Sequence, residues 1–364
     1  MRKFFFQLHL WASLTISPLL LIFALTGSLM TFEPELDHLL HAKLSHVTAG
    51  GHTLSLAQIS ESVNRSFPKD TINQYYVATD PGISYQISTN NRTIYIDQYS
   101  GEILGTATSP DFWNKAQNFI HQLHLRLALR DKHDTGGIIM SWAAVVMLLI
   151  LPSGLVLWWK QKRITVRKKS KGRQAWSDLH SMIGVLIFLL LLVPVLTGVI
   201  MGFEKVTTPL MYKITSSKPA MQPDTKIDVP AGAQMISADS AYHIAQSAIP
   251  GAKPFDIFAF GAGQAYYIRC RFPEDLTPGG RSTVIINSYT GKVMYAQGSR
   301  TAPAGTRLHI LTRAIHTGDV FGIPTKFLGL VVCLALALQI LSGLKMWWMR
   351  KYGKGQKAGI SKPA

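Results

Sequence analysis

Long apolar runs alternate with long polar segments along this chain of 364 residues. The apolar runs lie at 4–32, 137–159, 180–203 and 325–348. Each run holds about the 20 residues that a helix needs to cross roughly 30 Å of hydrocarbon. The polar segments between them, at 33–111 and 204–305, contain short stretches in which apolar and polar residues alternate. We therefore predict an integral membrane protein with four transmembrane helices and two folded domains outside the bilayer.

The two halves of the chain repeat one another. "LTGSLMTFE" at 25–33 returns as "LTGVIMGFE" at 196–204, at the end of the first and third apolar runs. "SGLVLWW" at 153–159 returns as "SGLKMWW" at 342–348, at the end of the second and fourth runs. A repeat of this length indicates a tandem duplication of one unit, in the order apolar helix, β-rich segment, apolar helix.

Each polar segment has the pattern of a helix followed by short strands. "SLAQISESVNRSF" and "SADSAYHIAQSAI" have helical spacing, and "IYIDQYSGEIL" returns loosely as "VIINSYTGKVM", with turn signals before a last strand. We expect one helix packed on a small antiparallel sheet in each segment. Neither contains GxSxG, HExxH or a carboxylate cluster, and Asp97 has Asn287 as its counterpart. We interpret both domains as binding or scaffolding modules.

The formal net charge of +17 is concentrated at one side of the four-span topology. Eight Lys or Arg residues lie between Lys160 and Arg173, Arg2 and Lys3 open the chain, and the tail after Trp348 is also basic. By the positive-inside rule this side is cytoplasmic, so both termini face the cytoplasm and both polar domains face outward. The basic loop is then a topology signal in contact with anionic lipid, rather than a nucleic-acid site.

These observations define ten segments. They are transmembrane helix 1 (4–32), periplasmic domain 1 (33–111), an amphipathic connector (112–136), transmembrane helix 2 (137–159), a basic cytoplasmic loop (160–179), transmembrane helix 3 (180–203), periplasmic domain 2 (204–305), a second connector (306–324), transmembrane helix 4 (325–348) and a basic cytoplasmic tail (349–364). A cleaved signal peptide is the alternative for the first run, but that run is too long and lacks a small-residue cleavage site. Cys270 and Cys333 fall in different compartments, and there is no CxxC motif.

Histidines occupy equivalent places in the two halves. His9 lies 18 residues before Gly27, and His180 lies 18 residues before Gly198. Because 18 residues make five helical turns, each histidine shares a helix face with its glycine, about 27 Å away. Both histidines lie near the cytoplasmic ends of their spans, where they form an inner pair.

A second pair of histidines is expected at the outer side of the bilayer. His121 and His124 precede the second span, and His316 precedes the fourth. His124 is preferred to His121 because it follows a leucine, as His9 and His180 do. Gly27 and Gly198 fall at the depth of this outer pair.

Two imidazoles at one depth on different helices can ligate a haem iron from opposite sides. The sequence predicts two haems, one on His9 and His180, the other on His124 and His316. Glycine lets a backbone approach a macrocycle, and Gly154 and Gly343 fall near the depth of the inner pair. For any one of these residues taken alone, the simpler interpretation is a histidine at the membrane interface or a glycine that serves helix packing. Their repetition in both halves favours haem over zinc, since no carboxylate or thiolate joins either pair.

This combination of features resembles the PepSY-associated transmembrane proteins. The shared features are four spans, two β-rich outer domains, LTG after spans one and three, SGLxxWW at the ends of spans two and four, and Leu-His before the spans. The family includes iron-regulated inner-membrane proteins and ferric-siderophore reductases of Gram-negative bacteria, and the resemblance covers about residues 4–348. It implies two small α+β, PepSY-like periplasmic domains.

The resemblance also implies that paired histidines hold b-type haems, and that electrons pass from the cytoplasmic side to the periplasm. There they would reduce Fe(III) in a ferric siderophore or ferric chelate and release Fe(II). The family's histidines match His9, His124, His180 and His316 here. His316 departs slightly, because Ile315 precedes it instead of leucine.

The electron donor must be a separate molecule, since the chain has no GxGxxG with a following acidic residue and no flavin domain. Quinol, reduced flavin or a reductase partner would serve. A non-enzymatic alternative is a membrane-anchored PepSY binding module or a siderophore-uptake accessory protein. A permease is disfavoured, because no charged residue lies in the middle of a span.

Overall fold

The computed structural model describes residues 1–364 apart from 109–111, 160–161, 163, 168–169 and 354–364. Parts of the predicted basic loop and most of the predicted basic tail therefore lie outside the described residues. The chain forms two compact units. The helical unit contains Met1–Phe32, Asn118–Thr207 and the chain from Thr312 onward, and the sheet unit contains Glu33–Gln117 and Thr208–Leu311.

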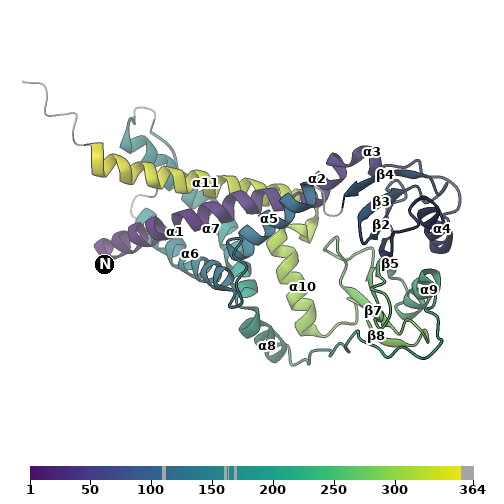
Figure 1. The fold of residues 1–364 in the computed structure, drawn as a ribbon. Helices are drawn as coiled ribbons and strands as arrows, with labels where there is room; N and C mark the ends of the chain where they lie inside the picture. The colour runs from purple at the N-terminus through teal and green to yellow at the C-terminus, as the bar shows by residue number, and fades with distance from the viewer. Residues whose placement is uncertain (109–111, 160–161, 163, 168–169, 354–364) are drawn as a thin grey trace, which may run out of the picture. The chain divides into compact units, whose positions relative to one another are not determined.

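The helical unit is built on four long helices (Figure 1). They are α1 (Arg2–Met30), α6 (Thr135–Trp159), α7 (Arg173–Gly202) and α11 (Ile323–Tyr352). Each is long and apolar enough to cross a membrane, which confirms the prediction of four candidate spans. Both α1 and α7 pack against α6 and α11, so α1 and α7 occupy opposite corners of the bundle.

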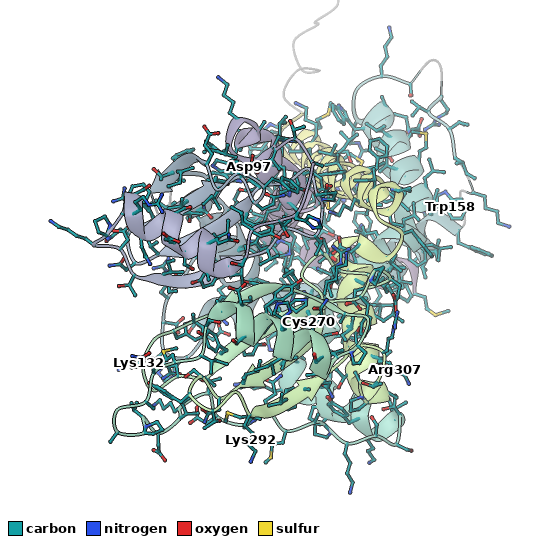
Figure 2. All side chains as sticks on the ribbon, turned by 90° about the vertical axis from the view of Figure 1, so that its right-hand side faces the viewer. Asp97, Lys132, Trp158, Cys270, Lys292 and Arg307 are labelled. Carbon is teal, nitrogen blue, oxygen red and sulfur yellow. The ribbon has the colours of Figure 1, made fainter. Side chains whose placement is uncertain are left out.

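Apolar side chains cover the outside of this bundle as well as its interior. The interior contains Leu20 of α1, Met147 of α6, Ile187 of α7 and Leu336 of α11. Many apolar side chains point outward, and Leu189 is 69% exposed. Exposed apolar surface on this scale indicates contact with lipid. At the end of α6, Trp158 (Figure 2) contacts the exposed Trp159 edge to face, as an interfacial aromatic belt would.

Shorter helices connect the spans to the sheet unit. They are α2 (Glu33–Leu40), α3 (Ala42–Ser45), α5 (Phe112–Arg126), α8 (Glu204–Ile214), α10 (Ala304–Thr317) and the 3₁₀ helix η1 (Asp319–Phe321). The predicted connector 112–136 contains α5, and α10 begins two residues before the predicted connector 306–324. Residues 127–134 join α5 to α6, and a Cβ on Gly136 would overlap the carbonyl oxygen of Arg126. Only glycine fits this approach, which sets the position of α5 beside the bundle.

The sheet unit contains one antiparallel sheet of eight strands, in the order β4-β3-β2-β1-β5-β6-β7-β8. The strands are β1 (Ile72–Tyr76), β2 (Tyr85–Thr89), β3 (Arg92–Ile96), β4 (Ile103–Thr108), β5 (Lys253–Phe258), β6 (Tyr266–Arg271), β7 (Ser282–Ile286) and β8 (Val293–Gln297). The two polar segments were expected to form separate domains, each with its own sheet. Instead β1 pairs with β5 and joins the two halves, which leaves fewer exposed strand edges than two separate sheets would have.

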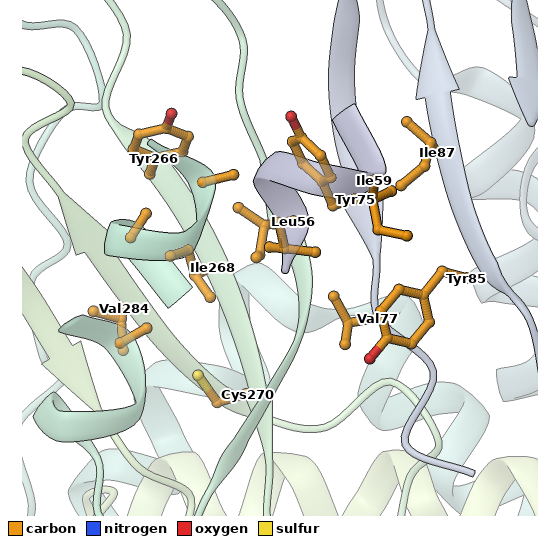
Figure 3. Close-up of a cluster of buried hydrophobic side chains, with 14 of the residues drawn as sticks. Leu56, Ile59, Tyr75, Val77, Tyr85, Ile87, Tyr266, Ile268, Cys270 and Val284 are labelled. Carbon is orange, nitrogen blue, oxygen red and sulfur yellow. The ribbon is translucent and has the colours of Figure 1, made fainter. Parts of the chain in front are cut away.

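Two helices, α4 (Leu56–Ser66) and α9 (Ala238–Ala248), pack on this sheet, one from each half. Figure 3 shows part of the resulting core, where Ile59 of α4, Ile87 of β2 and Ile268 of β6 are fully buried. Full burial of such a side chain stabilises a fold by about 1.5–3 kcal/mol. Each half therefore has the predicted form of one helix on a small antiparallel sheet.

The counterparts Asp97 (labelled in Figure 2) and Asn287 have the same structural role. The Asp97 Oδ1 accepts a hydrogen bond from the backbone N–H of Tyr99 at 2.8 Å, and the Asn287 Oδ1 accepts one from Tyr289 at 3.0 Å. An amide oxygen and a carboxylate oxygen serve equally well in such a turn. The substitution between the halves is therefore explained by turn geometry.

Asp239, in the first turn of α9, caps α4 in the other half of the sheet. Its two carboxylate oxygens accept hydrogen bonds from the backbone N–H groups of Leu56 and Ala57, both at 2.7 Å. We expect Asp239→Ala to lower the free energy of unfolding of the sheet unit by about 1–2 kcal/mol, as the loss of a helix cap does. Urea titration of the full chain, followed by circular dichroism, measures this change.

The matched control is Asp228→Ala, which removes an exposed carboxylate from the same unit. The control should unfold at the same urea concentration as the unchanged protein. Equal midpoints for the two variants would show that Asp239 adds nothing to the stability of α4.

Candidate functional site

Four histidines lie at helix–helix contacts inside the helical unit, in two pairs. His9 on α1 and His180 on α7 lie toward the end where α6 stops and α7 begins, which we call the basic end. His124 on α5 and His316 on α10 lie on helices that lead into the sheet unit, which we call the domain end. Each pair takes one histidine from each half of the repeat.

The two rings of the basic-end pair come from helices at opposite corners of the bundle and contact each other edge to face. The ring centroids of His9 and His180 are 6.2 Å apart, and the ring planes are nearly perpendicular, at 86°. Each ring is held in place by hydrogen bonds to a neighbouring long helix from its own half of the chain. His9 contacts α6, and His180 contacts α11.

Both basic-end rings use the Nδ1 atom for this contact. The Nδ1 of His9 lies 3.0 Å from the Ser153 Oγ and 3.2 Å from the Ile150 carbonyl oxygen. The Nδ1 of His180 lies 3.0 Å from the Ser342 Oγ and 3.1 Å from the Gln339 carbonyl oxygen. The same arrangement therefore occurs twice, once in each half.

The domain-end rings use Nδ1 in the same way, with threonine in place of serine. The Nδ1 of His124 lies 2.7 Å from the Thr26 Oγ1, and that of His316 lies 3.0 Å from the Thr197 Oγ1. Burial lowers the pKa of His124 to about 4, and the nearby His316 and His121 contribute to this shift. His124 is therefore neutral at neutral pH, and His316 is close enough to affect its charge.

The hydrogen-bond network assigns the tautomer of all four rings. The hydroxyl groups of Ser153, Ser342, Thr26 and Thr197 donate to the carbonyl oxygens of Ile150, Gln339, Ile22 and Val193, respectively. Because each hydroxyl hydrogen is used in this way, the hydroxyl oxygen accepts from the histidine, and the Nδ1 carries the hydrogen. The lone pair of Nε2 is then available on every ring, as metal ligation requires.

The four predicted glycines lie against the histidine rings. An added Cβ would lie 3.0 Å from the His9 Cε1 at Gly154 and 3.2 Å from the His180 Cε1 at Gly343. At the domain end the Cβ would lie 3.2 Å from the His316 Cε1 at Gly198 and 3.7 Å from the His124 Cε1 at Gly27. The glycines were predicted to make room for a macrocycle, and the contacts described here are with the imidazoles.

Sequence reasoning missed the hydroxyl residues that hold the rings. Thr26 and Thr197 are the threonines of the two LTG motifs, and Ser153 and Ser342 are the serines of the two SGL motifs. In each motif the residue directly before the glycine binds a histidine. The repeated pairs Thr-Gly and Ser-Gly could have indicated these contacts. A hydroxyl beside a glycine, at equivalent places in two apolar helices, is typical of a hydrogen bond to a side chain on a closely packed neighbouring helix.

Other side chains near the pairs contribute less to the site. The Cys333 thiol lies 3.3 Å from where a Cβ on Gly27 would be, and thus near His124. The Phe23 ring packs edge to face against His124, with centroids 5.3 Å apart. Among the described residues, no group of three or more His, Cys, Asp or Glu side chains converges as a metal site.

These features fit a haem better than a metal ion bound by protein groups alone. With metal–nitrogen bonds of about 2 Å on both sides and half a ring beyond each nitrogen, two axial imidazoles place their centroids roughly 6 Å apart. The 6.2 Å between the centroids of His9 and His180 agrees with this value and equally with direct edge-to-face packing of the two rings, so the distance does not by itself select haem. A porphyrin supplies four of its own nitrogens, so two histidines complete the coordination of its iron.

Comparison with known proteins agrees with this architecture. No significant match to a curated protein is found. A family model described as the PepSY-associated TM region matches residues 6–350, nearly the whole chain. The match covers nearly all of the four long helices, both halves of the sheet and the four histidines. The chain therefore belongs to the PepSY-associated transmembrane family.

Proposed function

We propose that this membrane protein is a di-haem electron-transfer protein that reduces ferric iron. Electrons enter at the basic end, which we place in the cytoplasm, and leave at the domain end, which we place in the periplasm of a bacterial inner membrane. The acceptor is Fe(III) in a ferric siderophore or another ferric chelate, and Fe(II) is released for uptake.

One observation carries this proposal: two histidine pairs, each with one histidine from each half, bind hydroxyl groups through Nδ1, and no hydrogen bond to their Nε2 atoms is found among the described residues. Buried polar side chains in membrane helices are costly and usually functional. A structural role alone would be satisfied by the Nδ1 contacts. It would leave the second nitrogen of every ring without a purpose.

The residues of this chain hold and orient the proposed cofactors. Haem supplies reversible one-electron chemistry when it is bound. His9 and His180 would bind the first iron, and His124 and His316 the second. The serine and threonine hydroxyls fix the tautomer of each ring, and the apolar interior excludes water and shapes the redox environment. The donor is a separate molecule, such as quinol, reduced flavin or a reductase partner.

Reoxidation of the reduced protein tests the acceptor. The full chain, reduced anaerobically with dithionite and freed of excess reductant, is mixed with a ferric siderophore or with a small ferric chelate. We expect the reduced absorption bands to disappear while a colorimetric Fe(II) chelator traps one Fe(II) for each electron lost. The siderophore and the simple chelate together show how selective the acceptor site is.

The matched variant is His316→Ala, which removes a ligand at the domain end. It should retain the basic-end absorption and lose most of the rate of Fe(II) release. Unchanged absorption on mixing, with no Fe(II) trapped from either chelate, would contradict reduction of ferric iron. A protein that binds siderophore equally well with and without its histidines would instead be the binding module considered from the sequence.

A further inference from the structure

The eight-stranded sheet has a second face, opposite the one that α4 and α9 cover. Along β6, the side chains of Tyr266, Ile268 and Cys270 belong to the core under those helices (Figure 3). Because side chains alternate along a strand, Arg269 and Arg271 lie on the opposite face. Two guanidinium groups therefore follow one another along this strand, and their surroundings differ.

Arg269 is held by its neighbours. Its guanidinium donates to the Asp256 Oδ2 on β5 at 3.2 Å and to the Gly279 carbonyl oxygen at 2.6 Å. The Gln74 amide on β1 donates to the other oxygen of Asp256 at 2.7 Å. The positive charge of Arg269 is therefore offset by Asp256, and its hydrogen bonds hold the loop that contains Gly279.

Arg271 lacks such partners. Its Nε atom is buried, and no hydrogen-bond acceptor for it is found among the described residues. The residue opposite Arg271 on β5 is Lys253, an exposed cation of the same sign. A buried charged donor has lost its water, so leaving it without an acceptor is costly. The surroundings of Arg271 therefore favour the binding of a negatively charged acceptor.

The loop at 272–281, which follows β6, lies against Arg271. A Cβ on Gly280 would lie 3.1 Å from the Arg271 Cβ. Thr277 in this loop is 5% exposed, and its hydroxyl oxygen is buried without a hydrogen-bond partner in the part of the chain that the structure describes. The loop thus contains a second buried polar group that is available to a ligand.

The acidic residues of the same loop are engaged elsewhere. The Glu274 carboxylate accepts hydrogen bonds from the Arg300 guanidinium. The Asp275 carboxylate accepts from the Ser299 hydroxyl at 2.6 Å and from the backbone N–H of Phe272 at 2.9 Å. Both acids therefore have other partners, which leaves the positive charge of the neighbouring strand to attract an anion.

Tyr76 of β1 lies on the same face of the sheet. Its ring packs edge to face against Phe255, with ring centroids 6.1 Å apart. Burial first, and then the charges of Asp256 and Asp37, raise the pKa of Tyr76, while the nearby Arg271 opposes this shift. The Tyr76 hydroxyl therefore keeps its hydrogen at neutral pH and can donate a hydrogen bond to an anion.

We infer that the sheet unit has an oxyanion site between β6 and the loop at 272–281, in which the guanidinium of Arg271 binds a carboxylate or a phosphate group. A guanidinium presents a planar fork of N–H donors that matches either group. Lys253 and Tyr76 flank this site from neighbouring strands. The site needs no haem, so the inference is independent of the proposed electron transfer.

Isothermal titration calorimetry of the full-length protein in nanodiscs, at physiological ionic strength, tests the inference. Citrate, ferric citrate and inorganic phosphate are the probes. We expect saturable binding of at least one probe. Arg271→Gln keeps a hydrogen-bond donor but loses the charge, so it should weaken this binding about tenfold or more. The matched control is Arg65→Gln, which removes an exposed arginine of α4 in the same unit and should leave binding unchanged.

The three probes identify the source of the oxyanion. Binding of phosphate alone would assign the site to a phosphate group, and binding of both citrate probes would assign it to a carboxylate. Tighter binding of ferric citrate than of citrate would identify the iron chelate as the ligand. If Arg271→Gln does not fold, Arg271→Lys, which keeps the charge but loses the planar fork, should weaken binding several-fold.

A melting curve without ligand separates a binding role from a structural one. Arg271→Met should melt no lower than the unchanged protein, because a buried donor without an acceptor does not stabilise a fold. A lower melting temperature would assign Arg271 a structural role and overturn the inference. So would the absence of saturable binding for all three probes, or equal binding with and without Arg271. Protein that binds no haem should still bind the oxyanion, so this inference and the proposed function fail separately.

Discussion

Replacing His9 with alanine is expected to reduce the haem content from about two to about one b haem per chain, because an iron with one axial histidine is held far less tightly. The ring centroids of His9 and His180 are 6.2 Å apart, and both rings make the hydrogen bonds found among the described residues through Nδ1 and not through Nε2. His180→Ala should have the same effect. The double variant should lose no more than either single variant, since both residues serve one iron.

The measurement is a pyridine haemochrome assay against protein concentration, on chains expressed with ample haem. His243→Ala is the matched control, because His243 is an exposed histidine on α9 of the sheet unit. It should retain the full haem content. If the double variant His9→Ala and His180→Ala lost twice as much as either single variant, the two residues would not share one iron.

Gly343→Leu is expected to remove the same basic-end haem without touching a ligand. A Cβ at this position would already lie 3.2 Å from the His180 Cε1, and leucine adds three more carbons in the same place. The ring must then turn away from α11 and lose its bond to the Ser342 hydroxyl. The expected spectrum is therefore that of His180→Ala.

Gly329→Leu provides the control on the same helix, because a Cβ at Gly329 meets no atom within 4 Å. This variant should keep both haems. Gly343→Ala should be intermediate, since one methyl group requires the ring to shift by only a few tenths of an ångström. Full haem content in Gly343→Leu would mean that the glycine serves helix packing alone.

Much of the architecture was predictable because it rests on strong local signals. Span composition identified the four long helices. The helix-plus-sheet form of each polar segment followed from its alternating pattern. These are properties of single segments, which periodicity reports well.

Contacts between distant segments were not predictable in the same way. Nothing in the residues of β1 and β5 indicated that they would pair and join the halves into one sheet, because any exposed strand edge offers the same backbone groups. The hydroxyl partners of the histidines were missed for a related reason. Thr26 and Ser153 are far from His124 and His9 in sequence, and a helical serine or threonine commonly bonds only to its own backbone.

The histidines themselves were found from spacing, since their equivalent positions in the two halves could be read directly. The choice of His124 over His121 rested on the preceding leucine, and the structure places His124 against Thr26 and Gly27. The glycines were predicted to let the helix backbone approach a macrocycle. The structure adds a second role that could not be read from sequence spacing: the glycines leave room for the imidazole rings to pack against the helices.

The most direct test of the central claim is an optical spectrum of the purified full-length protein, oxidised and then reduced with dithionite, with a haemochrome count. We predict sharp reduced bands of b haem with bis-histidine ligation and about two haems per chain. A protein that stays free of haem after expression with ample haem supply would contradict the account, and the four histidines would then need another explanation.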